Sequence, residues 1–161
     1  MPTDFCEVFN DHLDHLYTVS LLLTADYPKA EQSFLAALED CLQGNPVFRQ
    51  WAQPWATRAV IKNAIRIISP LQNETDTTTE NYDLTEATSE AGIPRAAITR
   101  LRPFERFVFV MSILEKYSDR ECSILLDCTV EEIVCARTQA LQRLVSVCLE
   151  GREALDLAAS A

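Results

Sequence analysis

The chain has 161 residues, of which 48% are hydrophobic and 24% charged, a balance typical of a globular protein with one ordinary domain or two small ones. Its 24 acidic and 14 basic residues give a net charge of -10, which opposes non-specific attraction to nucleic-acid phosphates or anionic lipid. Only three glycines are present, which argues against a glycine-rich nucleotide loop and a turn-dense β-sandwich. No apolar run reaches the roughly 18 residues that a membrane span needs, and the acidic residues 1–4 are unlike a secretion signal. We therefore expect no membrane association and a cytoplasmic location.

The six cysteines form no C-x-x-C pair, so their spacing does not predict a zinc site. In the reducing cytosol we expect free thiols that pack as small hydrophobic side chains, with a redox role for Cys122 and Cys128 as the alternative. His12 and His15 are three residues apart and could share a metal ion, but His12 falls on an apolar stripe, where a core histidine is the usual finding. No glycine-framed nucleophile motif is present. We expect no metal, no cofactor and no enzymatic activity.

Charge divides the chain into three parts. Residues 1–69 carry 8 acidic and 5 basic residues, residues 70–93 carry 6 acidic and no basic residues, and residues 94–161 carry 10 acidic and 9 basic residues. The middle part is rich in Thr, Glu, Asp and Asn, and it has too few large apolar residues to offset the entropy of ordering it. We interpret it as an acidic linker between two small helical domains, 1–69 and 94–161, and as a segment that could cover a basic face.

Apolar residues recur at helical spacing in both domains. In the first domain this predicts a helix over 5–23, a second over 28–42 and a third that begins at Pro54 and ends before Pro70. In the second domain it predicts a helix over 104–114. Two capping boxes then follow, Ser118 with Glu121 and Thr129 with Glu132, each at the start of a further helix. The last helix has Val130, Ile133, Leu141, Leu144 and Val145 as its apolar side.

A short helix, a turn of about three residues and a longer helix form the outline of a helix-turn-helix. No long stretch alternates between apolar and polar residues as a strand would. The sequence therefore predicts an all-α fold: an N-terminal helical bundle, the acidic linker and a C-terminal helix-turn-helix domain.

Residues 101–109, LRPFERFVF, resemble the opening of region 4 in bacterial RNA polymerase sigma factors of the sigma-70 type. Residues 114–126 look like the helix before the turn of that region, and residues 129–144 are similar to its DNA-reading helix. The first domain is a weaker match to region 2 of the small, two-domain extracytoplasmic-function sigma factors, through residues 22–26 (LLTAD) and the order of its helices.

The resemblance implies a transcription regulator that binds core RNA polymerase and promoter DNA and answers to an anti-sigma protein. The expected DNA contacts in the second domain are Arg120, Arg137, Gln139 and Arg143. In the first domain, Trp51 and Trp55 would stack on unpaired bases beside a basic row on one helix face: Arg58, Lys62 and Arg66. The alternative for the two tryptophans is a place in the core or between domains, with the three cations on a solvated face.

Several positions depart from the family pattern. Val134, Cys135 and Ala136 stand where the DNA-reading helix usually carries a Lys-Ser-Arg run, and Arg137 stands where a core leucine is usual. Glu131 and Glu132 at the start of this helix would repel phosphates, although they also favour its dipole. The alternative is therefore a sigma-like interaction module that binds no DNA and instead binds polymerase, an anti-sigma partner or itself.

Overall fold

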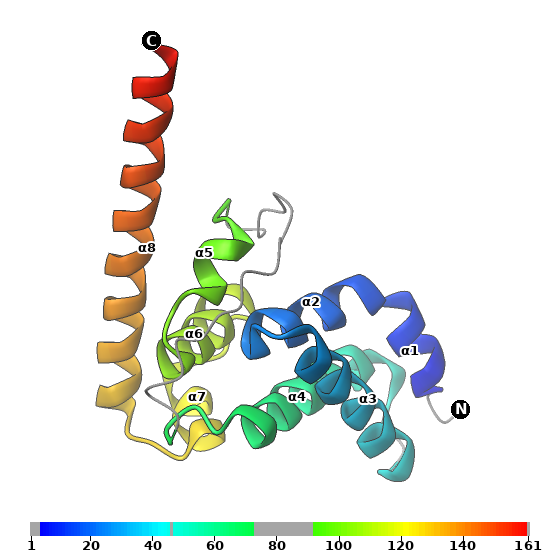
Figure 1. Cartoon of the computed structure of the whole chain (residues 1–161). Coiled ribbons are helices and arrows are strands. Elements are labelled where there is room, and N and C mark those ends of the chain that lie inside the picture. The colour runs from blue at the N-terminus through cyan, green and yellow to red at the C-terminus, as the bar shows by residue number, and fades with distance from the viewer. Residues whose placement is uncertain (1–3, 46, 73–91, 161) are drawn as a thin grey trace. The chain divides into compact units, whose positions relative to one another are not determined.

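The computed structural model describes residues 4–45, 47–72 and 92–160, and all the regular elements in those ranges are helices (Figure 1). The all-α prediction is confirmed at this level. The chain divides into two compact units, Met1–Thr79 and Glu80–Ala161, and the division falls inside the predicted linker. Most of that linker, residues 73–91, lies outside the described residues. None of the described helices is long and apolar enough to cross a membrane.

The first unit is built from four helices: α1 (Phe5–Asp11), α2 (Leu13–Thr24), α3 (Tyr27–Gln43) and α4 (Arg49–Ile68). Helix α2 is buried along most of its second half, and Leu16 and Leu23 are fully enclosed. Two buried hydroxyls link the helices, because Ser20 donates to the Ala30 carbonyl at 2.7 Å and Ser33 donates to the Val60 carbonyl at 3.2 Å. Apolar burial and these hydrogen bonds hold α2, α3 and α4 together.

Two predictions for this unit are wrong in detail. The predicted helix over 5–23 is broken at His12, which is exposed rather than part of the core. The weak helix formers Asn10 and Asp11 come just before the break. The third helix begins at Arg49 rather than Pro54, so the proline lies inside it. Pro54 is exposed and sits in the second turn, where its ring removes one backbone hydrogen bond without ending the helix.

The second unit consists of α5 (Arg95–Thr99), α6 (Pro103–Phe109), a π-helical turn η1 (Val110–Leu114), α7 (Asp119–Leu126) and α8 (Val130–Ala159). Its core is formed by residues 107–111 together with Ile98, Leu126 and Ile133. The predicted helix over 104–114 thus changes to π geometry at Val110, whose carbonyl accepts from the Glu115 amide at 3.0 Å.

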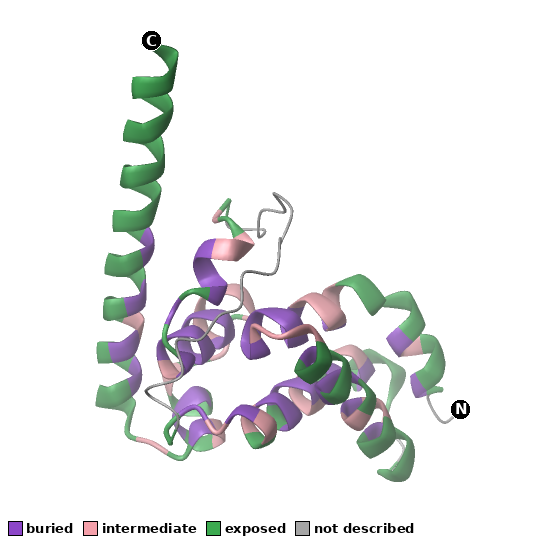
Figure 2. Cartoon of the chain, in the orientation of Figure 1, coloured by how far each residue is buried: buried purple, intermediate pink, exposed green. Residues whose placement is uncertain are grey.

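Helix α8 packs through only part of the predicted apolar side, because Ile133 and Leu144 are buried but the other three predicted residues are not. Ile133, Ala136, Ala140 and Leu144 are its buried residues. Val130, Leu141 and Val145, which were expected on the apolar side, are 44%, 39% and 57% exposed. The packed face contains two alanines, which let the helix backbone approach the core closely. Figure 2 shows burial only in the N-terminal half of α8, while its C-terminal half is exposed all round.

Candidate nucleic-acid interface

Helix α4 carries a row of aromatic and basic side chains along one face. Counted at 3.6 residues per turn, its five helical members fall within about 80° of arc, and the N-cap residue Phe48 directly precedes them. We call the row the α4 stripe; its members are Phe48, Trp51, Trp55, Arg58, Lys62 and Arg66. Because α4 begins at Arg49, one helix carries the aromatic and the basic members in a common register.

The stripe faces away from the core of its unit. Phe48, Trp51 and Trp55 are 78%, 61% and 50% exposed. Lys62 and Arg66 are exposed and Arg58 is half-buried. The opposite face of α4 is buried through small and apolar residues, including Ala56, Val60 and Ala64. The two tryptophans are therefore surface residues of their unit, so the alternative is wrong where it placed them in the core, and a place between the domains stays a prediction.

A short polar network fixes the C-terminal end of the stripe. The buried amide of Asn63 donates to Oδ2 of Asp40 on α3 at 2.8 Å, and its carbonyl oxygen accepts from Arg66 at 3.2 Å. The Asn63 amide thus links the Arg66 guanidinium to Asp40, whereas the exposed Lys62 ammonium lies one turn earlier. The stripe combines aromatic faces at one end with positive charge at the other, the combination that single-stranded nucleic acids bind.

In the second unit, α7 and α8 are joined by the three-residue turn 127–129. Both predicted capping boxes are confirmed. Ser118 caps α7 with Glu121, and Thr129 caps α8 with Glu132, whose carboxylate accepts from the Thr129 amide at 2.7 Å. The Thr129 hydroxyl also donates to this carboxylate at 3.0 Å, and the hydrogen bonds from the amide and the hydroxyl lower the pKa of the Glu132 carboxyl. Asp127 adopts the left-handed conformation at φ 54°, which an aspartate tolerates at a helix end.

The outward face of α8 is solvent-exposed, as a docking helix requires, but few free cations lie on it. Glu131, Val134 and Cys135 are exposed, whereas Ala136 is buried and cannot contact a partner. Gln139 is exposed, and its amide lies 3.6 Å from the Cys135 sulfur. The exposed N-terminal surface of α8 is therefore acidic, polar or apolar rather than basic.

Two of the three arginines expected to contact DNA in this unit are paired with carboxylates. Both terminal nitrogens of Arg137 donate hydrogen bonds to the Asp119 carboxylate on α7. These hydrogen bonds are the main reason that the pKa of the Asp119 carboxyl is lowered. Arg143 lies 3.1 Å from Glu105 on α6. Arg120 is exposed on α7. A role of these residues in DNA binding stays a prediction. Arg137 links α8 to α7 and Arg143 links α8 to α6, so both also form contacts within the unit.

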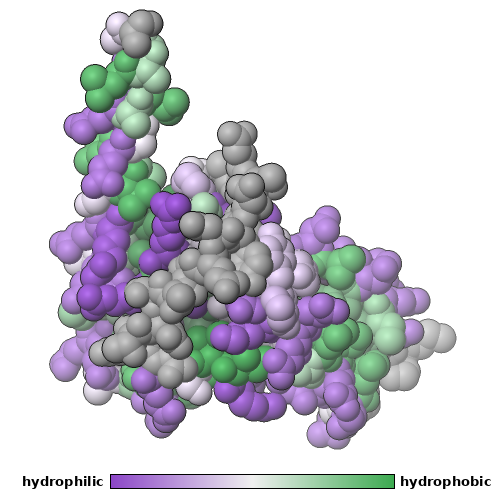
Figure 3. Space-filling view, in the orientation of Figure 1, coloured by the Kyte–Doolittle hydropathy of each residue, from purple (hydrophilic) through white to green (hydrophobic). Residues whose placement is uncertain are grey.

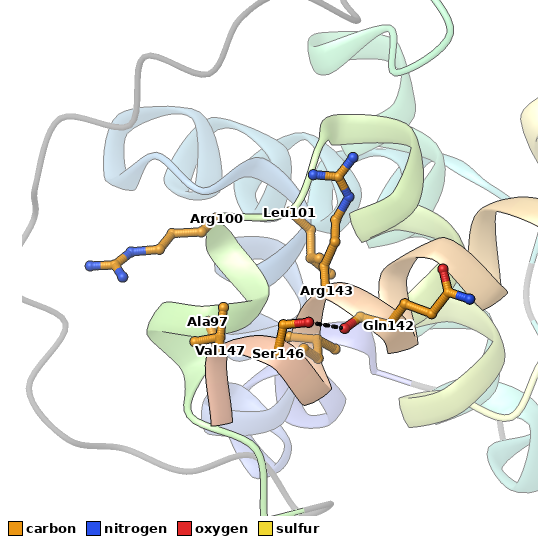
Figure 4. A pocket seen from close by; sticks show the side chains of 8 residues that line it. Ala97, Arg100, Leu101, Gln142, Arg143, Ser146 and Val147 are labelled. Carbon is orange, nitrogen blue, oxygen red and sulfur yellow. Dashed lines mark hydrogen bonds between the residues drawn. The ribbon is translucent and has the colours of Figure 1, made fainter. Parts of the chain in front are cut away.

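A shallow cavity of about 360 Å³ lies between α5 and the middle of α8. Ala97, Leu101, Leu144 and Val147 give it apolar walls. Figure 4 shows the Arg100 and Arg143 guanidinium groups extending away from the other labelled side chains, while Ser146 donates to the Gln142 carbonyl at 3.0 Å. The charged groups thus lie at the edge of the cavity, and its interior offers apolar contact.

The described residues include no group of three or more His, Cys, Asp or Glu side chains placed to hold a metal ion. All six cysteines are free. Burial raises the pKa of both the Cys41 and the Cys122 thiol to about 11, so at neutral pH both are protonated and unreactive. Cys122 therefore behaves as the small core residue that we expected, and the redox alternative gains no support from its thiol.

One member of the stripe, Phe48, was missed by the sequence analysis. The signal was available, because residues 48, 51 and 55 have the spacing of one helix face. It was overlooked because Pro54 was interpreted as the start of the helix rather than as a residue inside it.

The two surfaces differ in what they offer a nucleic acid. The α4 stripe presents stacking faces and positive charge, whereas the α7–α8 pair presents an exposed helix face whose arginines are largely paired with carboxylates.

No family model, curated protein or solved structure matches the chain.

Proposed function

We propose that this chain is a sigma-factor-like transcription regulator that binds core RNA polymerase and promoter DNA, with the α4 stripe holding unpaired bases. The observation that carries the proposal is the exposure of Trp51 and Trp55 on the same helix face as Arg58, Lys62 and Arg66. Solvent-exposed tryptophans aligned with cations are costly on a surface without a partner and suit a strand whose bases have been unstacked.

The dimensions of the stripe fit a short single strand. From residue 51 to residue 66 the helix rises by about 23 Å, and the two tryptophans are about 6 Å apart along its axis. That separation suits neighbouring bases pulled out of a duplex stack, each lying on an indole ring. The cations further along the helix would then neutralise the phosphates that follow.

In the proposal the second unit is the helix-turn-helix domain, in which α7 and α8 lie against duplex DNA or polymerase. The three-residue turn, the two capping boxes and the exposed outer face of α8 support this assignment. Arg120 and Gln139 are the side chains with most freedom to contact DNA there. Because Arg137 and Arg143 are engaged by carboxylates, duplex binding by this unit would be weak without polymerase.

The second candidate is a sigma-like interaction module that binds polymerase or an anti-sigma partner without reading DNA. The acidic entry of α8 at Glu131 and Glu132, together with the exposed Val134, favours it. The two candidates differ in one requirement, since only the first needs nucleic acid on the α4 stripe.

Intrinsic fluorescence tests the stripe directly, because the only two tryptophans in the chain both lie on it. We expect a single-stranded oligonucleotide of about 12 nucleotides to quench this emission, and a duplex of the same sequence to quench it far less. Anisotropy of labelled single strands should show Trp51→Ala and Trp55→Ala each weakening binding by about 5-fold or more, since stacking contributes roughly 1–3 kcal/mol per base. Leu35→Ala, a truncation of an exposed side chain on α3, is the control and should change nothing.

The cations have a matched control of their own. Lys62→Gln removes one charge from the stripe, and Lys29→Gln removes the same charge from the exposed start of α3. We expect only Lys62→Gln to lower the salt dependence of single-strand binding, by about 0.7 in the logarithmic slope. Equal effects of the two variants would show that only net charge matters and would reject the stripe as a binding surface.

Co-purification with core RNA polymerase from a bacterial extract separates the regulator from a general single-strand binder. Retention of the polymerase by the full chain supports either sigma-like candidate, and additional quenching by single-stranded DNA selects the first. Quenching without polymerase retention would overturn the sigma-factor assignment while leaving the α4 stripe as a nucleic-acid surface.

A further inference from the structure

The connection between α5 and α6 is rich in arginine. Residues 95–106 contain four arginines and one glutamate, in a chain whose net charge is -10. Arg106 is buried, and its guanidinium donates to the Thr99 and Leu101 carbonyls at 3.3 and 3.1 Å. These two carbonyls flank Arg100, so the buried arginine fixes the backbone from which the exposed Arg100 side chain extends.

The cavity between α5 and α8 lies directly beside Arg100. Its volume of about 360 Å³ falls at the lower end of the range of small-molecule sites. Ala97, Leu101 and Leu144 in its walls are 6%, 5% and 2% exposed, and Val147 is the most exposed of its apolar residues at 37%. The three buried residues are already packed within the unit, so the apolar wall exists before any ligand arrives.

Both charged residues that line the cavity are arginines, and no acidic residue lines it. Within the described residues no carboxylate pairs with Arg100, whereas Arg143 is held 3.1 Å from Glu105. Figure 4 shows the Arg100 side chain reaching outward from the cavity, and an exposed side chain of this length turns rapidly between rotamers. Its guanidinium is therefore available to an anion at the rim.

We propose that this cavity binds a small amphipathic anion, a carboxylate with an unbranched alkyl tail. The tail lies against the apolar walls and the carboxylate binds Arg100. Figure 3 shows apolar and strongly hydrophilic side chains next to one another along α8, the mixed surface that such a ligand requires. The inference goes beyond the proposed function, because it requires neither DNA nor polymerase.

The two arginines have different parts in this site. An anion that drew Arg143 away would leave the buried Glu105 carboxylate uncompensated, which is unfavourable. Binding at Arg100 breaks no such pair, so the ligand carboxylate lies there while Arg143 stays on Glu105. The positive charge of Arg143 still favours an anion nearby, and it disfavours a cation.

Octanoate is a suitable probe, because its amide, octanamide, carries the same tail without the charge, and inorganic phosphate carries charge without a tail. For an open cavity and a ligand of this size we expect a dissociation constant on the order of 1 mM. Methyl NMR of the full chain should show saturable shifts at Ala97, Leu101 and Val147 with octanoate. Octanamide should bind about 5-fold more weakly or less tightly still, and each methylene removed from the tail should weaken binding by about 2- to 4-fold. Absence of saturation below about 20 mM, octanamide binding as tightly as octanoate, or the same shifts with phosphate would overturn the proposal.

Two pairs of variants place the ligand. Arg100→Gln and Arg102→Gln remove the same charge from exposed positions two residues apart, of which only Arg100 lines the cavity. We expect Arg100→Gln to weaken octanoate binding by about 5-fold or more without changing that of octanamide, and Arg102→Gln to weaken it by less than about 2-fold. Equal effects of the two would show that only net charge matters and would reject the site.

The second pair is Val147→Asp, in the cavity wall, and Val145→Asp, outside it on the exposed surface of α8. Val147→Asp places a carboxylate where the ligand lies and should weaken octanoate binding by about 10-fold or more, against less than about 2-fold for Val145→Asp. Circular dichroism of both variants checks that the helix is retained, and equal weakening would again reject the site. Lys62→Gln on the α4 stripe should leave octanoate binding unchanged, so the result is independent of the test of nucleic-acid binding.

Discussion

Arg143 on α8 lies against a carboxylate that the second unit buries, with its Nε 3.1 Å from Oε2 of Glu105 on α6. The Glu105 side chain is 4% exposed and that of Arg143 is 48% exposed. Within the described residues, neither Glu105 oxygen accepts a hydrogen bond of good geometry. Arg143 is therefore the cation that compensates this buried charge, and a ligand that draws it away leaves Glu105 uncompensated.

Removing Arg143 should destabilise the second unit. We expect Arg143→Ala to lower the free energy of unfolding by about 1–3 kcal/mol, because a buried carboxylate loses its compensating charge. Arg120→Ala, at an exposed position on α7, should cost less than about 0.5 kcal/mol. Hydrogen exchange of α6 to α8 in urea is the suitable measurement, since both tryptophans lie in the other unit.

A second substitution separates the charge from the packing of Arg143. Adding Glu105→Gln to Arg143→Ala should recover most of the lost stability, because the double variant no longer buries a charge. A double variant as unstable as Arg143→Ala alone would show that the loss comes from side-chain packing.

The capping box of α8 provides a second prediction. Thr129→Ala should cost about 1 kcal/mol, since it removes the hydroxyl that accepts from the Glu132 amide at 3.2 Å. Thr138→Ala makes the same change in the exposed middle of α8, where the hydroxyl donates only to the Val134 carbonyl. It should be neutral or slightly stabilising, because alanine is the better helix former. Thermal unfolding followed by circular dichroism compares the two variants.

The cysteines should react at different rates with a maleimide at pH 7. Cys6, Cys135 and Cys148 are exposed and should be modified first, with Cys128 slower. Cys41 and Cys122 are buried, and their raised thiol pKa of about 11 leaves almost no thiolate. Mass spectrometry should therefore show three rapid additions, and unfolding in urea should release the rest. Early modification of Cys122 would contradict the packing of α7 against α8.

Acid should weaken the second unit through two carboxyls. The pKa of Asp119 is lowered by its hydrogen bonds from Arg137, and that of Glu132 by its hydrogen bonds from Thr129. A lowered folded-state pKa adds stability that is present above the unfolded value, near 4, and is lost as pH falls through the folded one. The protection of α7 and α8 against hydrogen exchange, taken relative to the intrinsic exchange rate at each pH, should thus fall below about pH 4. In Asp119→Asn, the part of this change due to the Arg137 pair should disappear.

The sequence alone determined the helical class and several local features. Helical spacing of apolar residues, two capping boxes and the break at Asp127 to Thr129 all depend on residues near one another in the chain, and the structure has each of them. The hydrogen bonds of a capping box join residues three apart in the chain, so they can be predicted from the sequence alone. The basic row on α4 also followed from spacing alone.

Only the tertiary structure decided which face of each helix is covered. Large residues predicted the packed side of α8, and Ile133 and Leu144 do lie on it, but Leu141 and Val145 are exposed. Ala136 and Ala140 complete the packed side instead, because close approach of two helices favours small side chains. The exposure of Trp51 and the pairing of Arg143 with Glu105 likewise depend on residues distant in sequence. Local spacing defines the possible faces of a helix, and contact with other helices selects among them.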